Sequence, residues 1–303
     1  MNKRLLSVLL MNLLITGLSC VHDHEVHDDT ATDLGHDHDS DLQRSDLTKV
    51  VDPHITLEFV ARVGNQIAQC GTKYAEVGKG GTASIELNDL RFYIHDLRLV
   101  DDTGLEVPID LTPDQKWQYQ NVALLDFEDK SGACTGTVER NTQIKGLVPD
   151  GSRHWQGVRF RVGVPFALNH ADVSTAPSPL NLSSMFWTWQ SGYKFVRIEG
   201  DTGTGGSFIV HLGSTGCMKD GSGKVVSCQS PNRPEVALTG FDPLANKITV
   251  DVGALLAESN LASPMGTECM SGPGNSDCAP IFSQLGLPYG AAPASSQKIF
   301  RVE

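Results

Sequence analysis

The chain has 303 residues and a formal net charge of -12. This acidic balance argues against nucleic acid as a partner, because nucleic-acid binding rests on lysine and arginine side chains that neutralise phosphates. Beyond the first twenty residues, no stretch approaches the roughly eighteen uninterrupted apolar residues of a membrane-spanning helix, so the rest of the chain is expected to be soluble.

The first twenty residues have the order of a secretory signal peptide. Two basic residues, Lys3 and Arg4, precede a mostly apolar run over residues 5–18, and Cys20 follows. A lipoprotein-type signal ends at such a cysteine. We therefore expect residues 1–20 to be removed or anchored. A lipid on Cys20 would then be the only link to a membrane, in a periplasmic or cell-surface protein.

Residues 21–50 are strongly acidic and poor in large apolar side chains. Their nine acidic residues against Arg44 and Lys49 contribute -7 to the net charge. Such a segment cannot bury enough surface to offset the entropy lost on ordering, so we expect a disordered tether. Histidines that alternate with carboxylates in it could capture Cu(II), Zn(II) or Ni(II) weakly, or the segment could be a plain solvated spacer. These histidines are His22, His24, His27, His36 and His38.

From His54 onward, short alternating or β-branched runs recur between turn signals, which is typical of strands. Helical periodicity is visible only over residues 252–258. The pattern predicts one all-β domain over residues 51–303, an antiparallel β-sandwich of about nine strands. The predicted strands are 55–60, 82–87, 91–100, 122–125, 157–162, 194–198, 207–212, 235–238 and 247–251.

Long loops interrupt the predicted strands at residues 163–193 and 213–234, and an irregular tail follows residue 259. If Cys20 carries a lipid, an even number of cysteines remains, which favours disulfides in an oxidising compartment. Sequence alone leaves the pairing open, but short spacings make two local bridges the simplest choice and leave one long bridge. The favoured pairs are Cys70–Cys134, Cys217–Cys228 and Cys269–Cys278. The second would pin the loop 213–234, and the third would pin the tail.

Familiar catalytic motifs are absent from the sequence. It contains no Gly-x-Ser-x-Gly, no His-Glu-x-x-His, no P-loop and no Gly-x-Gly-x-x-Gly ahead of a helix. Nor does it contain Cys-x-x-Cys, which argues against a thioredoxin-like motif, a zinc ribbon and a c-type haem. Hydrolase and dehydrogenase activities therefore lose their usual support.

Three histidines of the predicted domain are candidates for a site. His211 is expected on the polar side of strand 207–212. The apolar alternation changes phase after His95, which predicts a β-bulge at His95 and Asp96. His170 lies in the first long loop. Taken singly, each is more often a hydrogen-bonded structural residue than a metal ligand.

The four tryptophans are Trp117, Trp155, Trp187 and Trp189. Trp187 and Trp189 belong to the aromatic stretch 185–195, for which burial in the core is the simplest interpretation. Trp117 instead lies in a polar neighbourhood and is less obviously a core residue.

Five segments of the chain resemble the MbnP family, also called metallo-mystery pair four-cysteine-motif proteins. The resemblance runs in order from about residue 54 to the C-terminus, so it covers nearly all of the predicted domain. The segments are DLRFYIHDLRL (89–99), NVALLDFE (121–128), GVPFALNH (163–170), MFWTWQSGYKF (185–195) and HLGSTGC (211–217).

The resemblance implies an exported copper-binding protein that is paired with an MbnH-type di-haem enzyme of the cytochrome c peroxidase type. In that system the partner oxidises a tryptophan to kynurenine, and the modified site then binds copper. The ring-opened product offers an aniline nitrogen and a ketone, where indole offers no usable lone pair, and imidazoles complete a borderline site. The family's four cysteines would be Cys70, Cys134, Cys217 and Cys228.

By the same resemblance, His211 is the first candidate for a copper ligand, followed by His170 and His95. Trp117 is the expected kynurenine precursor, because it lies just before the matching segment 121–128. Trp187 and Trp189 are the alternatives.

Two other functions stay open at this point. The chain could be a surface adhesion or carbohydrate-binding module, with the tryptophans as a stacking platform and residues 21–50 as a stalk. It could also be a redox enzyme in its own right, with copper as the catalyst.

Overall fold

The computed structural model describes residues 52–149 and 153–303. The expected signal peptide, the lipid on Cys20 and the tether with its five histidines lie outside the described residues. Within the described part, no helix is both long enough and apolar enough to cross a lipid bilayer.

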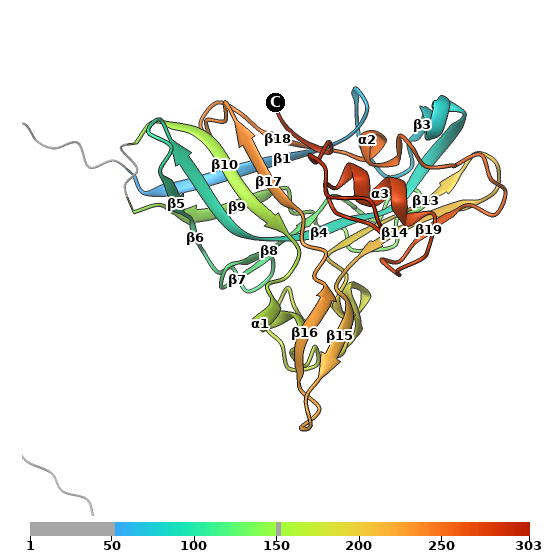
Figure 1. Cartoon of the computed structure of the whole chain (residues 1–303). Helices are drawn as coiled ribbons and strands as arrows, with labels where there is room; N and C mark the ends of the chain where they lie inside the picture. Colours follow the sequence, from blue (N-terminus) through green and yellow to red (C-terminus); the bar gives the residue numbers. More distant parts are fainter. Residues whose placement is uncertain (1–51, 150–152) are drawn as a thin grey trace, which may run out of the picture. The chain divides into compact units, whose positions relative to one another are not determined.

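The expected all-β, sandwich-like fold is confirmed. A six-stranded and a ten-stranded sheet make up most of the described chain, and two short hairpins accompany them (Figure 1). Most strand pairs are antiparallel, but β1 with β18 and β14 with β19 are parallel. Each of these two pairs joins segments that are distant in sequence, as a parallel pair requires.

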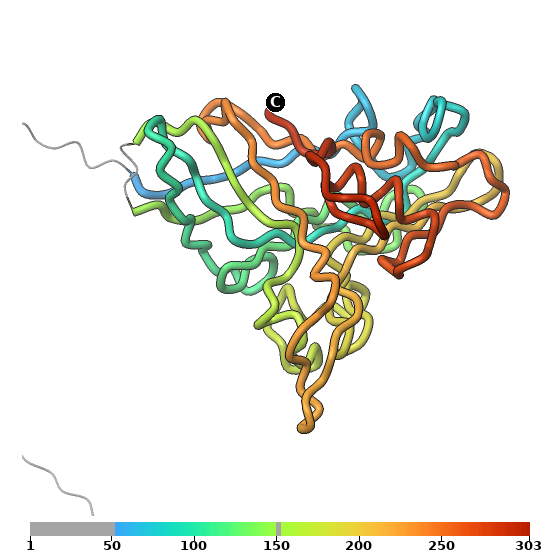
Figure 2. The backbone as a smooth tube through the Cα atoms, in the orientation of Figure 1, coloured from blue at the N-terminus to red at the C-terminus, as the bar shows by residue number. Residues whose placement is uncertain are grey.

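The smaller sheet has the order β20-β18-β1-β9-β6, with β2 paired to β1. Alternate residues of β1 from Ile55 to Val63 are buried, which is the pattern that predicted the strand. Figure 2 shows the last segment of the chain returning to the neighbourhood of this first strand. The strands are β1 (His54–Val63), β2 (Gln66–Ile67), β6 (Asp110–Leu111), β9 (Gln143–Leu147), β18 (Ile248–Asp251) and β20 (Phe300–Val302).

The larger sheet has the order β17-β10-β4-β13-β14-β19, and four short strands join it off this path. The main strands are β4 (Ala83–Asp101), β10 (Trp155–Val162), β13 (Val196–Thr202), β14 (Ser207–Leu212), β17 (Glu235–Thr239) and β19 (Thr267–Cys269). The short ones are β3 (Lys73–Val77), β5 (Glu106–Pro108), β7 (Gln118–Tyr119) and β8 (Val122–Asp126).

The central strand β4 merges two predicted strands, 82–87 and 91–100. The predicted bulge is present: Arg159 pairs with Arg98 and Arg161 with His95, so β4 has one extra residue there, and Asp96 has a φ of 54°. The expected break at residues 88–90 is a second register shift rather than a turn. A bulge keeps the ladder continuous where alternation alone suggests an end.

Several elements lie in segments that were predicted as loops. The hairpin β15 (Thr215–Lys219)–β16 (Val225–Ser230) occupies the second long loop, and β11 (Phe186–Thr188)–β12 (Gly192–Tyr193) lies in the first. These strands lack clean alternation, so period-two reasoning could not find them. The helical segments are η1 (Lys79–Gly81), α1 (Phe166–Asn169), η2 (Ser183–Met185), α2 (Val252–Leu256) and α3 (Cys278–Gln284).

Aromatic side chains join the two sheets at the core. Phe160 of β10 contacts Phe59 of β1 and Phe300 of β20 edge to face, with ring centroids 6.0 and 5.2 Å apart. Phe92 of β4 also meets Phe300, at 5.8 Å. Through these contacts the two sheets pack face to face, as in a β-sandwich.

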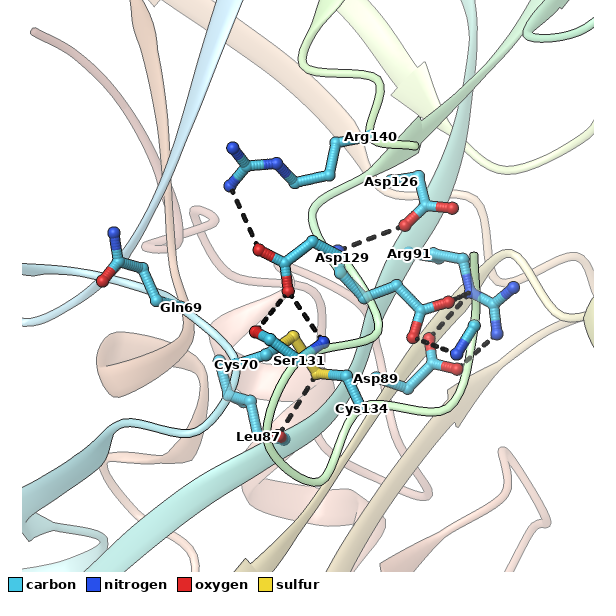
Figure 3. Close-up of a disulfide and its surroundings, with 12 residues drawn as sticks. Gln69, Cys70, Leu87, Asp89, Arg91, Asp126, Asp129, Ser131, Cys134 and Arg140 are labelled. Carbon is cyan, nitrogen blue, oxygen red and sulfur yellow. Dashed lines mark hydrogen bonds and ion pairs between the residues drawn. A yellow bond between two sulfur atoms is a disulfide. The ribbon is translucent and has the colours of Figure 1, made fainter. Parts of the chain in front are cut away.

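The described residues contain three disulfides, and they are the pairs that the cysteine spacing favours. Cys70–Cys134 closes a separation of 64 residues (Figure 3). Cys217–Cys228 joins β15 to β16, and Cys269–Cys278 joins β19 to α3.

Candidate metal centre

His211, the first predicted ligand, is buried on β14 and bonded to a carboxylate. Its Nε2 lies 2.6 Å from Oε1 of Glu199 on β13, and the residue is 5% exposed. The ring of Trp187 lies 6.3 Å away between centroids. Nδ1 of His211 is buried and has no hydrogen-bond partner in residues 52–149 and 153–303. The imidazole is therefore enclosed, with one nitrogen already engaged.

Glu199 lies at the partly exposed side of a layer of ion pairs on β4 and β13 that also reaches Glu128, just after β8. Arg197 lies 2.7 Å from Glu199 and 3.2 Å from Asp89. Arg91 pairs with Asp89 (Figure 3) and lies 3.4 Å from Glu128. Burial raises the pKa of Glu128. Because these charged side chains pair with one another, no metal ion is needed to explain why they lie together in the fold.

His170, the second predicted ligand, follows α1 and faces the Cys217–Cys228 disulfide. Its Nδ1 lies 3.1 Å from the backbone oxygen of Trp189, and its Nε2 lies 3.5 Å from Sγ of Cys228. Burial lowers the pKa of His170. As long as the two sulfurs are bridged they offer no thiolate, so this cluster presents one imidazole as a ligand.

His95, the third predicted ligand, is buried beside the β4 bulge. Its Nδ1 lies 2.8 Å from the backbone oxygen of Gly163. Burial lowers the pKa of His95 to about 4, so the ring is neutral at pH 7. This residue has the surroundings of a hydrogen-bonded structural histidine.

The structure does not gather the three predicted histidines. Among the described residues, no hydrogen bond or ring contact joins His95, His170 and His211 to one another. Two tryptophans of β11 and its turn do reach them: Trp187 through its ring to His211, and Trp189 through its backbone oxygen to His170.

Trp117 lies apart from these histidines. Its ring packs partly against the core, and Nζ of Lys116 lies 4.9 Å from the ring centroid. Its backbone N–H donates to Oδ1 of Asp114 at 2.6 Å. In the part of the chain that the structure describes, no histidine makes a hydrogen bond or ring contact with Trp117.

A pocket at one end of the sandwich is lined by two histidines and a tryptophan that were not predicted as site residues. These are His54, His154 and Trp155. The cavity has a volume of about 340 Å³. Its lining consists of Asp52, His54, Ile55, Val148, Arg153, His154, Trp155, Asp242 and Leu244.

Strand ends form this pocket. His54 begins β1 and pairs with Leu147, the last residue of β9. Trp155 begins β10 and pairs with Asp101, the last residue of β4. His154 precedes β10 directly, so both imidazoles lie where backbone ladders start and side chains remain open to solvent.

The lining of the pocket offers side chains that a borderline metal ion accepts, although the group of three or more ligand atoms within 4.8 Å of one another among the described residues is that of His170, Cys217 and Cys228. His54 and His154 are exposed, and Nδ1 of His54 lies 2.6 Å from Oδ1 of Asp52. A carboxylate on one ring nitrogen orients the ring and leaves the other nitrogen for a metal. Imidazoles with nearby carboxylates are ligands that copper accepts. The half-buried indole of Trp155 shares the same cavity, so a change in its chemistry would alter the ligand set.

The sequence contains only a weak indication of this pocket. His154 and Trp155 lie two to three residues before the predicted strand 157–162, and His54 directly precedes the predicted strand 55–60. Their meeting depends on which strand ends share an edge, and alternation does not encode this.

A family model described as MbnP matches residues 52–271. The fold is similar to a solved structure, MbnP from Methylosinus trichosporium, with a TM-score of 0.71 and 30% sequence identity. That match covers 82% of this chain and 97% of the other. No curated protein matches the chain.

Proposed function

The chain belongs to the MbnP family, and on that premise we propose that it is an exported, non-catalytic copper-binding protein. An MbnH-type di-haem peroxidase would complete its site by oxidising one tryptophan to kynurenine, and the role would be copper acquisition or handling. The observation that carries the proposal is the cavity in which His54, His154 and Trp155 lie together.

The residues of this pocket have complementary roles in the proposal. His54 and His154 supply imidazole nitrogens, and Asp52 fixes the orientation of His54. The nitrogen lone pair of Trp155 belongs to the aromatic system of the indole, so the intact residue is a poor ligand. Ring opening to kynurenine would provide an aniline nitrogen and a ketone oxygen in the same cavity.

This assignment differs from the one that the family resemblance suggested. Trp155 replaces Trp117 as the first candidate for oxidation, because Trp155 shares a cavity with two exposed histidines. The earlier set of His211, His170, His95 and Trp117 remains the competing assignment.

Paired substitutions distinguish the two assignments. The chain and its Trp155→Phe and Trp117→Phe variants would each be co-produced with the di-haem partner, and intact mass and copper content measured. We expect Trp155→Phe to lose both the kynurenine mass shift and the bound copper, and Trp117→Phe to retain both. Loss of both signals in Trp117→Phe but not in Trp155→Phe would assign the oxidised residue to Trp117. If both variants kept the kynurenine mass shift and the copper, neither tryptophan would be the oxidised residue.

The structure gives little support to a carbohydrate-binding platform. Trp189 is 45% exposed, but Nζ of Lys219 lies 3.8 Å from its ring centroid. A sugar ring would have to displace this ammonium group to stack on that face.

A further inference from the structure

We propose that the Cys70–Cys134 disulfide is a redox latch, which holds the loop of residues 129–140 closed over the buried carboxylate of Glu128. Reduction by a dithiol releases this latch loop, and water then reaches Glu128, while the two sheets stay folded. The latch shares no residue with the pocket of the proposed function and requires no copper.

The disulfide is the main attachment of the latch loop, which lies between β8 and β9. Residues 129–140 are all described; they form no helix or strand, and Cys134 is the only buried one among them. Val138 is 73% exposed. Asp129 bonds to Ser131 and lies 3.9 Å from Arg140, so its contacts stay within the loop (Figure 3). A segment without apolar anchors belongs to the least stable part of a fold.

The other attachments of the latch loop are weak or lie at its base. Glu139 pairs with Lys116, but the two side chains are 71% and 42% exposed, and such surface ion pairs contribute little. At the base, Asp126 and Asn141 exchange two backbone hydrogen bonds of 2.9 Å. The base therefore stays paired when the middle of the loop is released.

The partner cysteine is held in place independently of the bond. Tyr74 is 1% exposed, and its hydroxyl donates to the backbone oxygen of Ile67 at 2.8 Å. The same hydroxyl accepts a hydrogen bond of 2.7 Å from the backbone N–H of Gln69, the residue before Cys70. Reduction therefore frees the side of the latch loop and leaves the side of Cys70 where it is.

The latch loop rests directly on Glu128. This residue is 0% exposed, and its Oε2 accepts a hydrogen bond of 3.0 Å from the backbone N–H of Gly136. A Cβ atom added at Gly136 would lie 1.3 Å from Oε1 of Glu128. The loop backbone is thus the cover that separates this carboxylate from water.

Burial of the Glu128 carboxylate favours the open loop once the latch is broken. Among the described residues, its Oε1 accepts no hydrogen bond, and Nε of Arg91 lies 3.4 Å away. Arg91 also pairs with Asp89, so its charge is shared between two carboxylates. Burial and the charge of Asp89 raise the pKa of Glu128. A carboxylate that is incompletely paired in the interior gains free energy when water reaches it.

The redox step balances with a dithiol as reductant. Cys70 is half-buried and Cys134 is buried, so a thiolate of the reductant attacks the sulfur of Cys70. The S–S bond breaks, and the sulfur of Cys134 leaves and takes up a proton. The second thiol of the reductant then displaces Cys70 from the mixed disulfide. Two electrons and two protons pass to the protein, and the reductant becomes a disulfide.

The test combines hydrogen–deuterium exchange with carbodiimide labelling of carboxylates, before and after reduction by dithiothreitol. In the oxidised protein the amides of Cys134 and Gly136 are hydrogen-bonded and Glu128 is buried, so we expect slow exchange and no label there. Reduction should speed exchange of both amides by about tenfold or more and allow Glu128 to be labelled, while the amides of β4 and β13 stay protected.

Glu128→Gln separates the latch from a simple loss of a cross-link. A neutral side chain of the same size gains less from water, so the reduced variant should exchange faster than its oxidised form by no more than about threefold. Glu139→Gln is the matched control, because it neutralises an exposed carboxylate of the same loop and should open on reduction as the parent does. Cys217→Ser with Cys228→Ser should also open on reduction, which assigns the effect to Cys70–Cys134.

Three results would overturn the proposal: amides of Cys134 and Gly136 that stay protected after reduction, a Cys70–Cys134 bond that is reduced only when β4 and β13 also lose protection, or a reduced Glu128→Gln loop that opens as far as that of the parent. Exchange of β4 in the oxidised Glu128→Gln variant is its folding control. Copper content and the kynurenine mass shift report on the pocket, so the failure of either proposal is distinguishable from that of the other.

Discussion

Single residues decide whether the pocket binds copper as proposed. His54 and His154 are solvent-exposed imidazoles, so substituting them removes a ligand without opening a cavity in the core. We expect His54→Gln and His154→Gln each to lower copper affinity by about tenfold or more, while thermal stability stays near the parent value. Isothermal titration of the modified protein would measure the affinity.

His170→Gln is the matched control for these two variants in the disulfide-bonded protein. It alters one partly exposed imidazole outside the pocket. Equal losses of affinity in all three variants would contradict the assignment of the pocket.

His95 predicts a pH dependence of stability. Burial holds its folded-state pKa at about 4, against 6.5 for the ordinary residue. As pH falls below 6.5 the unfolded chain takes up this proton before the folded protein does. Stability is therefore lost between pH 6.5 and 4, by up to about 3 kcal/mol, and the loss levels off below pH 4.

Comparison with His95→Gln isolates this effect. Burial raises the pKa of Asp126 to about 7, so that carboxyl acts with the opposite sign and obscures the parent profile. Denaturant unfolding at pH 7 and pH 4.5 should show a smaller acid loss in the variant than in the parent. Parallel profiles would count against a buried neutral His95.

At the scale of elements, β14 depends on close approach to β11. A Cβ atom added at Gly213, just after β14, would lie 2.4 Å from Cζ3 of Trp187. We expect Gly213→Ala to destabilise the protein by about 1–3 kcal/mol, because the Trp187 ring and the backbone oxygen of Tyr193, 2.8 Å from that Cβ, must both move in a packed site. Gly221→Ala is the control, since nothing lies within 4 Å of a Cβ there. Guanidinium unfolding of both variants would check this, and equal midpoints would exclude the clash.

The disulfides should stabilise the fold according to the loops they close. Cys70–Cys134 spans 64 residues and Cys217–Cys228 spans 11. Loop-closure entropy predicts a loss of about 4 kcal/mol for the first pair and about 3 kcal/mol for the second when both cysteines become Ala. Urea unfolding would give the two losses. A larger loss for the short bridge would mean that packing around the hairpin outweighs chain entropy.

Elements with a clean alternation were predictable from sequence, and polar or twisted ones were not. Strand 207–212 has its predicted bounds, and the phase change after His95 correctly indicated a bulge. The β15–β16 hairpin escaped because its residues do not alternate between apolar and polar. Its backbone ladder, the cross-strand disulfide and the hydrogen bond from Gln190 to Cys217 hold it in place.

At the scale of the whole molecule, the site depends on topology. His54 and His154 are far apart in sequence, and they line one cavity because the starts of β1 and β10 and the end of β9 lie at the same side of the sandwich. A single sequence identifies strands but not the order in which their ends converge. The fold class was therefore predictable, whereas the pocket was not.

The central claim is that Trp155 is the residue oxidised to complete a copper site. The most direct measurement is peptide mass mapping of the unaltered chain after co-production with its di-haem peroxidase partner. We predict kynurenine at Trp155 and intact indole at Trp117, Trp187 and Trp189. Kynurenine at any of those three positions with Trp155 unchanged, or no conversion at all in copper-loaded protein, would contradict the account.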